Sequence, residues 1–199
     1  MALRIRAFMD YWNFELDMRA WDGAYKIDYD KLSGVLIREA ANVLGFPDPL
    51  NEGVRVYASI NPLTPQGRKQ RDFFNNALSN KTGYQVRIIQ RRTKRPPKCN
   101  NCNRQIEICP HCGEKIVRTV EKGVDTGIVT ELMQGAWDDT YDAAILLSSD
   151  RDYIPAVEYL QTRGKKIVHA GFGQSGHELP TKCWGRIQLH QFATEMRRP

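Results

Sequence analysis

Acidic residues stand where short apolar runs of the sequence end. Asp10 follows the run LRIRAFM, and Asp150 and Asp152 follow the run AAILLSS. Asp125 opens a further apolar stretch, GVDTGIVTELM. Carboxylates delivered by three segments are the hard oxygen ligands that Mg²⁺ and Mn²⁺ prefer, and these cations keep waters that a phosphate can displace. The pattern therefore indicates a divalent-cation site and, with it, phosphodiester chemistry.

The elements that must position these acids alternate between strands and helices. Strands are predicted over residues 3–9, 54–60, 84–90, 143–147 and 166–170, and helices over residues 31–45, 66–81, 125–137 and 154–162. This alternation predicts crossover connections and a mainly parallel sheet with helices on both faces. Ligands of such sheets bind beyond the carboxyl ends of the strands, so we expect Asp10, Asp150 and Asp152 to share one crevice.

Each acid also has a purely structural interpretation. Asp150 and Asn13 each precede a possible helix, where N-capping explains them, and Asp152 suits a first helical turn. Ser148 and Ser149 either cap a helix or hydrogen-bond a phosphate or a ligand carboxylate. Aromatic residues near the first acid either pack in the core or stack on unpaired bases. These are Tyr11, Trp12 and Trp21.

Cysteines form two Cys-x-x-Cys pairs that are separated by six residues. Two facing turns of this kind supply the four thiolates of a closed structural zinc site, with Cys99, Cys102, Cys109 and Cys112 as ligands. The alternatives are two disulfides, which a cytoplasmic setting disfavours, or reduced cysteines without metal. A four-sulfur site has no open coordination position, so zinc is assigned to folding an inserted ribbon over residues 91–121. Cys183 is left over and is expected to be a buried thiol.

Basic residues precede the cysteines in one short stretch that contains no acid. They are Arg87, Arg91, Arg92, Lys94, Arg95 and Lys98. With a formal charge of +6 and a pI of about 9.1, this stretch favours a nucleic-acid partner over a merely solvated basic face. No apolar run approaches the roughly 18 residues that a membrane span needs, so we expect a cytoplasmic protein without a membrane partner.

The whole chain of 199 residues suits one domain with an insertion. We identify no internal repeat, and the sequence does not indicate an oligomeric state. Three short segments, FMDYWN from residue 8, KGVD from residue 122 and LSSDRDYIP from residue 147, resemble the motifs of the NYN family, the PIN-like nucleases related to LabA-type proteins. Two positions depart from that pattern: Ser149 stands where a glycine is common, and Glu131 where a second aspartate is often found. The ribbon lies outside the minimal domain of that family.

The resemblance implies a PIN-like three-layer α/β/α fold over residues 1–199 and metal-dependent cleavage of RNA, in our interpretation endonucleolytic and directed at single strands. Asp10 and Asp150 would bind Mg²⁺ or Mn²⁺ directly, Asp125 and Asp152 directly or through water, and Asn13 would orient a water or a phosphate oxygen. The alternatives are a non-catalytic RNA-binding or adaptor protein that uses the ribbon and the basic stretch, and a DNA nuclease.

Overall fold

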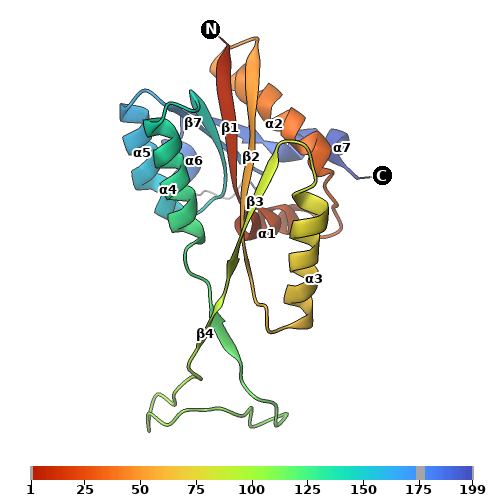
Figure 1. Cartoon of the computed structure of the whole chain (residues 1–199), viewed down its shortest axis with the longest axis vertical. Coiled ribbons are helices and arrows are strands. Elements are labelled where there is room, and N and C mark those ends of the chain that lie inside the picture. The colour runs from red at the N-terminus through yellow and green to blue at the C-terminus, as the bar shows by residue number, and fades with distance from the viewer. Residues whose placement is uncertain (1, 174–177, 199) are drawn as a thin grey trace.

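A six-stranded parallel sheet forms the centre of the computed structural model, which describes residues 2–173 and 178–198 (Figure 1). Its strand order is β3-β2-β1-β6-β7-β8, and each neighbouring pair is parallel. The strands are β1 (Leu3–Asp10), β2 (Pro49–Ile60), β3 (Tyr84–Gln90), β6 (Ala143–Leu147), β7 (Lys166–Gly171) and β8 (Gly185–Gln188). The predicted strands are confirmed, and β2 begins five residues earlier than Val54.

Helices cover both faces of the sheet, which confirms the expected three-layer α/β/α fold. Alternation along β1 directs Met9 into the core beneath α1, α2 and α7, and Phe8 into the core beneath α4, α5 and α6. The α-helices are α1 (Tyr11–Trp21), α2 (Tyr29–Leu44), α3 (Pro65–Phe73), α4 (Val124–Trp137), α5 (Ile154–Thr162), α6 (Glu178–Lys182) and α7 (Ala193–Met196). Short 3₁₀ turns lie at η2 (Arg151–Tyr153) and η3 (Leu189–Phe192).

Two helical segments differ from the sequence prediction. The helix expected over residues 66–81 ends at Phe73 and continues as a π-helical turn, η1 (Phe74–Leu78), in which Ser79 N donates to the Phe74 carbonyl. This wider turn places Phe74 and Leu78 together in the core. Helix α1 begins at Tyr11, two residues before Asn13, which the sequence analysis placed just ahead of a possible helix.

The strand order has a switch point at β1. From β1 the chain first adds β2 and β3 on one side, and later β6, β7 and β8 on the other side. The carboxyl ends of β1 and β6 are therefore neighbours from which the connections leave in opposite directions. Parallel sheets bind their ligands in the crevice at such a point.

An arm formed by residues 91–121 projects away from the sheet (Figure 1). Its stem is an antiparallel pair of short strands, β4 (Arg92–Lys94) and β5 (Arg118–Val120). Its tip contains two turns with the same hydrogen bonds: Cys99 N bonds to the Arg104 carbonyl at 2.8 Å, and Cys109 N to the Glu114 carbonyl at 2.8 Å. The expectation of no internal repeat is therefore wrong, because residues 97–106 and 107–116 form two equivalent ten-residue units.

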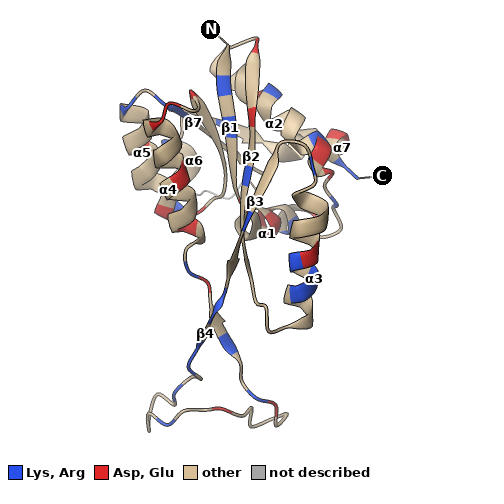
Figure 2. Cartoon of the chain, in the orientation of Figure 1, with Lys and Arg blue, Asp and Glu red and all other residues tan. Residues whose placement is uncertain are grey.

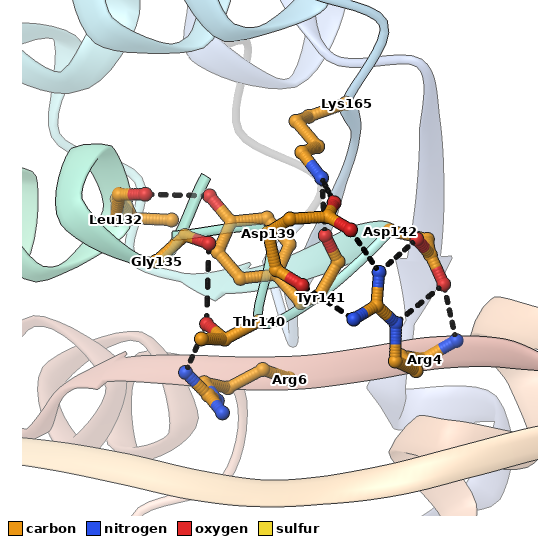
Figure 3. A network of polar contacts seen from close by, with 9 residues as sticks. All are labelled: Arg4, Arg6, Leu132, Gly135, Asp139, Thr140, Tyr141, Asp142 and Lys165. Carbon is orange, nitrogen blue, oxygen red and sulfur yellow. Dashed lines mark hydrogen bonds and ion pairs between the residues drawn. The ribbon is translucent and has the colours of Figure 1, made fainter. Parts of the chain in front are cut away.

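A network of hydrogen bonds and ion pairs connects residues at the opposite edge of the sheet, where β1 and β6 begin (Figure 3). The Arg4 guanidinium bonds to both carboxylate oxygens of Asp142, at 3.1 and 2.7 Å, and to Asp139 at 3.0 Å. Lys165 Nζ lies 2.6 Å from Asp139 and from the Tyr141 carbonyl. Each acid in this network has a cationic partner.

Candidate active site at the carboxyl edge of the sheet

Asp10 stands at the switch point, where it ends β1 and caps α1. Its side chain accepts a hydrogen bond from Asn13 N at 3.2 Å, as an N-cap residue does. The side chain is almost completely buried, at 6 % exposure. The pKa of Asp10 is raised to about 6, first by burial and then by the negative charges of Asp125, Glu121 and Asp150, while the Asn13 bond acts to lower it.

Asp150 and Asp152 follow β6 and begin η2. The Asp150 carboxylate accepts a bond from Asp152 N at 2.9 Å, and Asp150 N donates to Ser148 Oγ at 3.3 Å. Asp150 therefore caps the 3₁₀ turn with one oxygen, and Ser148 has a structural partner within the same loop. Asp152 is exposed in the first turn.

Asn13 connects the two loops that carry these acids. Its side-chain oxygen accepts a hydrogen bond from Ser149 N at 2.8 Å. This bond joins the first turn of α1 to the loop after β6, and so fixes Asp10 relative to Asp150. The amide that was predicted to orient a water or a phosphate thus has its oxygen engaged in positioning the acids.

Asp125 reaches the same region from the first turn of α4. Its carboxylate accepts a hydrogen bond at 3.0 Å from the hydroxyl of Tyr153, whose ring is buried. Burial raises the pKa of Asp125, as do the charges of Asp150, Glu121 and Asp152, whereas the Tyr153 bond lowers it. The carboxylates predicted from three segments therefore lie close enough for their charges to shift one another's pKa.

Glu121 is an acid of this region that the sequence analysis missed. It follows β5 at the base of the arm, where it accepts a hydrogen bond from Ser59 Oγ and pairs with Arg91 at 3.0 Å. Its charge raises the pKa of both Asp10 and Asp125. The three-residue strand before it gives no sequence signal, although its place four residues before Asp125 was a hint.

The described part of the chain contains no group of three or more His, Cys, Asp or Glu side chains arranged to hold a metal ion. The structure therefore brings the acids within electrostatic reach of one another without arranging them as a finished ligand set. Their chemistry nevertheless fits Mg²⁺ or Mn²⁺, because the donors are carboxylates. Burial is the main cause of the raised pKa values of Asp10 and Asp125, and the charges of the neighbouring acids add to it.

The cysteines are likewise brought together in pairs but not as a group of four. In each turn the first cysteine accepts hydrogen bonds from the backbone and thiol of the second, Cys99 from Cys102 and Cys109 from Cys112. These bonds lower the pKa of Cys99 and of Cys109, which favours the thiolate that zinc requires. The two cysteines of each pair therefore lie in contact with each other. By contrast, burial raises the pKa of Cys183 to about 12.

Lys and Arg residues lie on both the domain and the arm (Figure 2), and those predicted to bind nucleic acid divide into two groups. Arg87 and Arg91 are engaged with the domain: Arg87 lies 3.7 Å from Glu131 and over the ring of Tyr57, and Arg91 pairs with Glu121. The other four are exposed on the arm, namely Arg92, Lys94, Arg95 and Lys98. Helix α3 adds further exposed cations, namely Arg68, Lys69 and Arg71.

Two cavities differ in whether their lining includes residues that contact the acids. The larger, of about 960 Å³, is lined by the exposed face of α4 and α5, including Met133, Trp137 and Tyr159, and contains none of the predicted site residues. The smaller, of about 250 Å³, is lined by Trp12, Ser59 and Arg91, which adjoin Asp10 and Glu121. The described helices include none that is long and apolar enough to cross a membrane.

Comparisons with known proteins agree with this fold. The family model of the NYN domain matches residues 4–187. A crystal structure of a protein of unknown function from Vibrio parahaemolyticus superposes with a TM-score of 0.56 and 19 % identity, over 94 % of this chain and 92 % of that chain. At that identity the likeness shows the fold alone. A comparison with curated proteins gave no match.

Proposed function

The chain belongs to the NYN family, whose domains are generally PIN-like nucleases, and from that premise we propose that it is a divalent-metal-dependent endoribonuclease acting on single-stranded RNA. One observation carries the proposal: acids from the ends of β1 and β6 and from the start of α4 converge at the switch point of the sheet. PIN-like domains usually use divalent cations, and this is the edge where a parallel sheet binds its ligand.

Each acid has a distinct place in the proposed ligand set. Asp10 and Asp150 would hold the cation directly, and Asp125 and Asp152 directly or through water. Glu121 enlarges the set from the base of the arm. A bound Mg²⁺ or Mn²⁺ supplies a water of lowered pKa and neutralises the charge that develops on the phosphate.

Neighbouring groups fix these carboxylates in position. The hydroxyl of Tyr153 holds Asp125, and the side-chain oxygen of Asn13 holds the loop of Asp150 against α1. Arg91 and Ser59 hold Glu121. Ligands that are held by such bonds keep their geometry when the substrate arrives, which lowers the cost of assembling the reacting groups.

The arm is proposed to hold the RNA backbone beside this centre. Its exposed cations, together with those of α3, offer salt-dependent contacts to phosphates. Zinc bound by Cys99, Cys102, Cys109 and Cys112 would join the two turns of the tip. The hydrogen bonds within each turn favour the thiolate forms of Cys99 and Cys109 that zinc requires.

The function is tested by a cleavage assay on matched RNA and DNA oligonucleotides, with separate reactions in EDTA, Mg²⁺ and Mn²⁺. We expect cation-dependent internal cuts in RNA, and a loss of about a hundredfold or more in Asp150→Asn. Asparagine keeps the cap of η2, so this variant removes charge without removing the turn. Tight RNA binding without cleavage in any cation would instead identify an adaptor, and equal cleavage of DNA would broaden the substrate.

The zinc proposal has a separate test in the metal content of purified protein. Wild type is expected to contain one zinc per chain, and Cys109→Ser to contain little. Cys183→Ser is the matched control, because its thiol lies outside the arm and its raised pKa disfavours the thiolate. Zinc-free wild type, or equal zinc in all three proteins, would contradict the assignment.

A further inference from the structure

The smaller cavity beside the acids has the composition of a nucleobase site. It lies between the end of β2, the start of α1 and one side of α3, and its lining includes Trp12, Asn61, Gln66, Gln70 and Arg91. We propose that this cavity binds one unpaired base of the RNA next to the scissile phosphate, with a preference for adenine. The inference rests on the proposed nuclease function, for which it names a specificity site.

Trp12 provides a fixed aromatic wall. Its indole N–H donates to the Ser59 carbonyl at 2.6 Å, and its ring packs edge-on against Tyr11 and Phe74, with centroids 5.0 and 6.3 Å away. These contacts hold the ring while part of it stays accessible. Tyr11, in contrast, is buried. Unpaired RNA bases stack on aromatic faces of this kind, and of Tyr11, Trp12 and Trp21 it is Trp12 that lines this cavity.

Gln66 and Gln70 supply the polar edge. They lie four residues apart on α3, and therefore on one face of the helix. Among the described residues neither amide has a hydrogen-bond partner. Gly67 allows helix α3, which carries both glutamines, to pack closely against Asn61. A Cβ at position 67 would stand 1.7 Å from the Asn61 carbonyl oxygen. A glutamine amide presents a donor beside an acceptor, which matches N7 and the N6 amino group of adenine.

Arg91 explains why guanine is not the favoured base. An arginine recognises guanine by donating two parallel bonds to O6 and N7. Here Arg91 Nε already donates to Ser59 Oγ at 3.0 Å, and its terminal nitrogen to Glu121 at 3.0 Å. These bonds orient the guanidinium toward Ser59 and Glu121, and the amides of Gln66 and Gln70 are the neutral groups that would read the base. Ser59, which also anchors Trp12, ties the cavity to the metal-binding acids.

The cavity is small, as the proposal of one bound base requires. Its volume of about 250 Å³ lies below the roughly 300–1,000 Å³ of sites that enclose drug-sized ligands. Helix α3, which supplies Gln66 and Gln70, also carries exposed cations outside the cavity, namely Arg68, Lys69 and Arg71. One base would enter while the backbone stays on the basic rim.

The test compares cleavage of oligouridines that carry one central adenosine, guanosine or cytidine. Wild type is expected to cut beside adenosine about tenfold faster than beside the other bases, and Gln66→Ala and Gln70→Ala to remove most of that preference. Gln134→Ala, an exposed glutamine of α4 outside this cavity, is the matched control and should keep it. Equal cutting beside every base, or an adenosine preference that survives in both variants, would overturn the proposal while leaving the nuclease function intact.

A binding measurement decides the proposal even if no cation supports cleavage. Fluorescence anisotropy in EDTA compares labelled oligouridine with and without the central adenosine. We expect adenosine to tighten binding several-fold in wild type and in Gln134→Ala, and Gln70→Ala or Trp12→Leu to abolish this gain. Thermal unfolding identifies any misfolded Trp12→Leu protein, in which case Gln70→Ala alone decides. No gain from adenosine in wild type would refute the base site.

Discussion

The acids at the amino ends and at the carboxyl ends of the central strands differ in their partners and in the direction of their pKa shifts. At the amino edge Asp139 and Asp142 are paired with Arg4 and Lys165, which lower the pKa of both acids (Figure 3). At the carboxyl edge Asp10 is buried among other acids and its pKa rises to about 6. Paired acids stabilise a fold, whereas a buried, unmatched carboxylate destabilises it. The difference assigns the amino-edge acids to ion pairs within the fold, and it supports the proposal that the carboxyl-edge acids bind a cation.

The largest expected contrast is the effect of pH on cation binding. A carboxylate must lose its proton to bind Mn²⁺, so affinity should fall about tenfold per pH unit below the Asp10 pKa of about 6 and level off above it. Calorimetric titration with Mn²⁺ from pH 5 to pH 8 measures this. Constant affinity across that range would contradict a raised pKa for Asp10. Acids with lowered pKa values, like those at the amino edge, remain ionised throughout that range.

Asp10→Asn is expected to stabilise the cation-free protein. The folded pKa of Asp10 lies above its unfolded value, so ionisation disfavours the folded state as pH rises from about 4 through 6. Above pH 7 the neutral amide should gain on the order of 2–3 kcal/mol in free energy of unfolding. Near pH 4 the gain should disappear. Urea unfolding in EDTA at both pH values is the measurement, and a variant less stable than wild type at pH 8 would contradict the account.

Asp142→Asn should change stability in the other direction and by less. Its carboxylate accepts bonds from the backbone and side chain of Arg4, and its side chain is 34 % exposed. Solvent screening then limits the expected loss to about 1 kcal/mol at neutral pH. Because the folded pKa of Asp142 is lowered, this contribution should fade as pH drops below about 4. The same urea titrations, with and without Mn²⁺, should give the same loss.

The fold was predictable because its signals are local. Buried apolar runs mark the strands, and Gly45, with a φ of 75°, ends α2 where the sequence places the stop. The π-helical turn after Phe73 was not predictable, because it depends on how Phe74 and Leu78 meet the rest of the core. The local sequence of α3 does not specify where the π-helical turn begins.

The candidate site was predictable only for residues next to strand ends or covered by the family resemblance. Asp10 and Asp150 follow apolar strands, and the parallel-sheet rule places them together. Glu121 depends on where the arm returns to the domain, and the partners of Arg87 and Arg91 depend on strand register. The bond from Ser149 N to Asn13 joins residues 136 positions apart, which no local pattern reveals.

The most direct test compares the two edges in one reaction. The Mn²⁺-dependent rate of single-stranded RNA cleavage is measured for wild type, Asp10→Asn and Asp142→Asn under the same conditions. Each variant exchanges one carboxylate for an amide of the same shape. The account predicts that Asp10→Asn loses about a hundredfold or more in rate while Asp142→Asn stays within about twofold of wild type. Unchanged cleavage by Asp10→Asn, or equal losses in both variants, would contradict it.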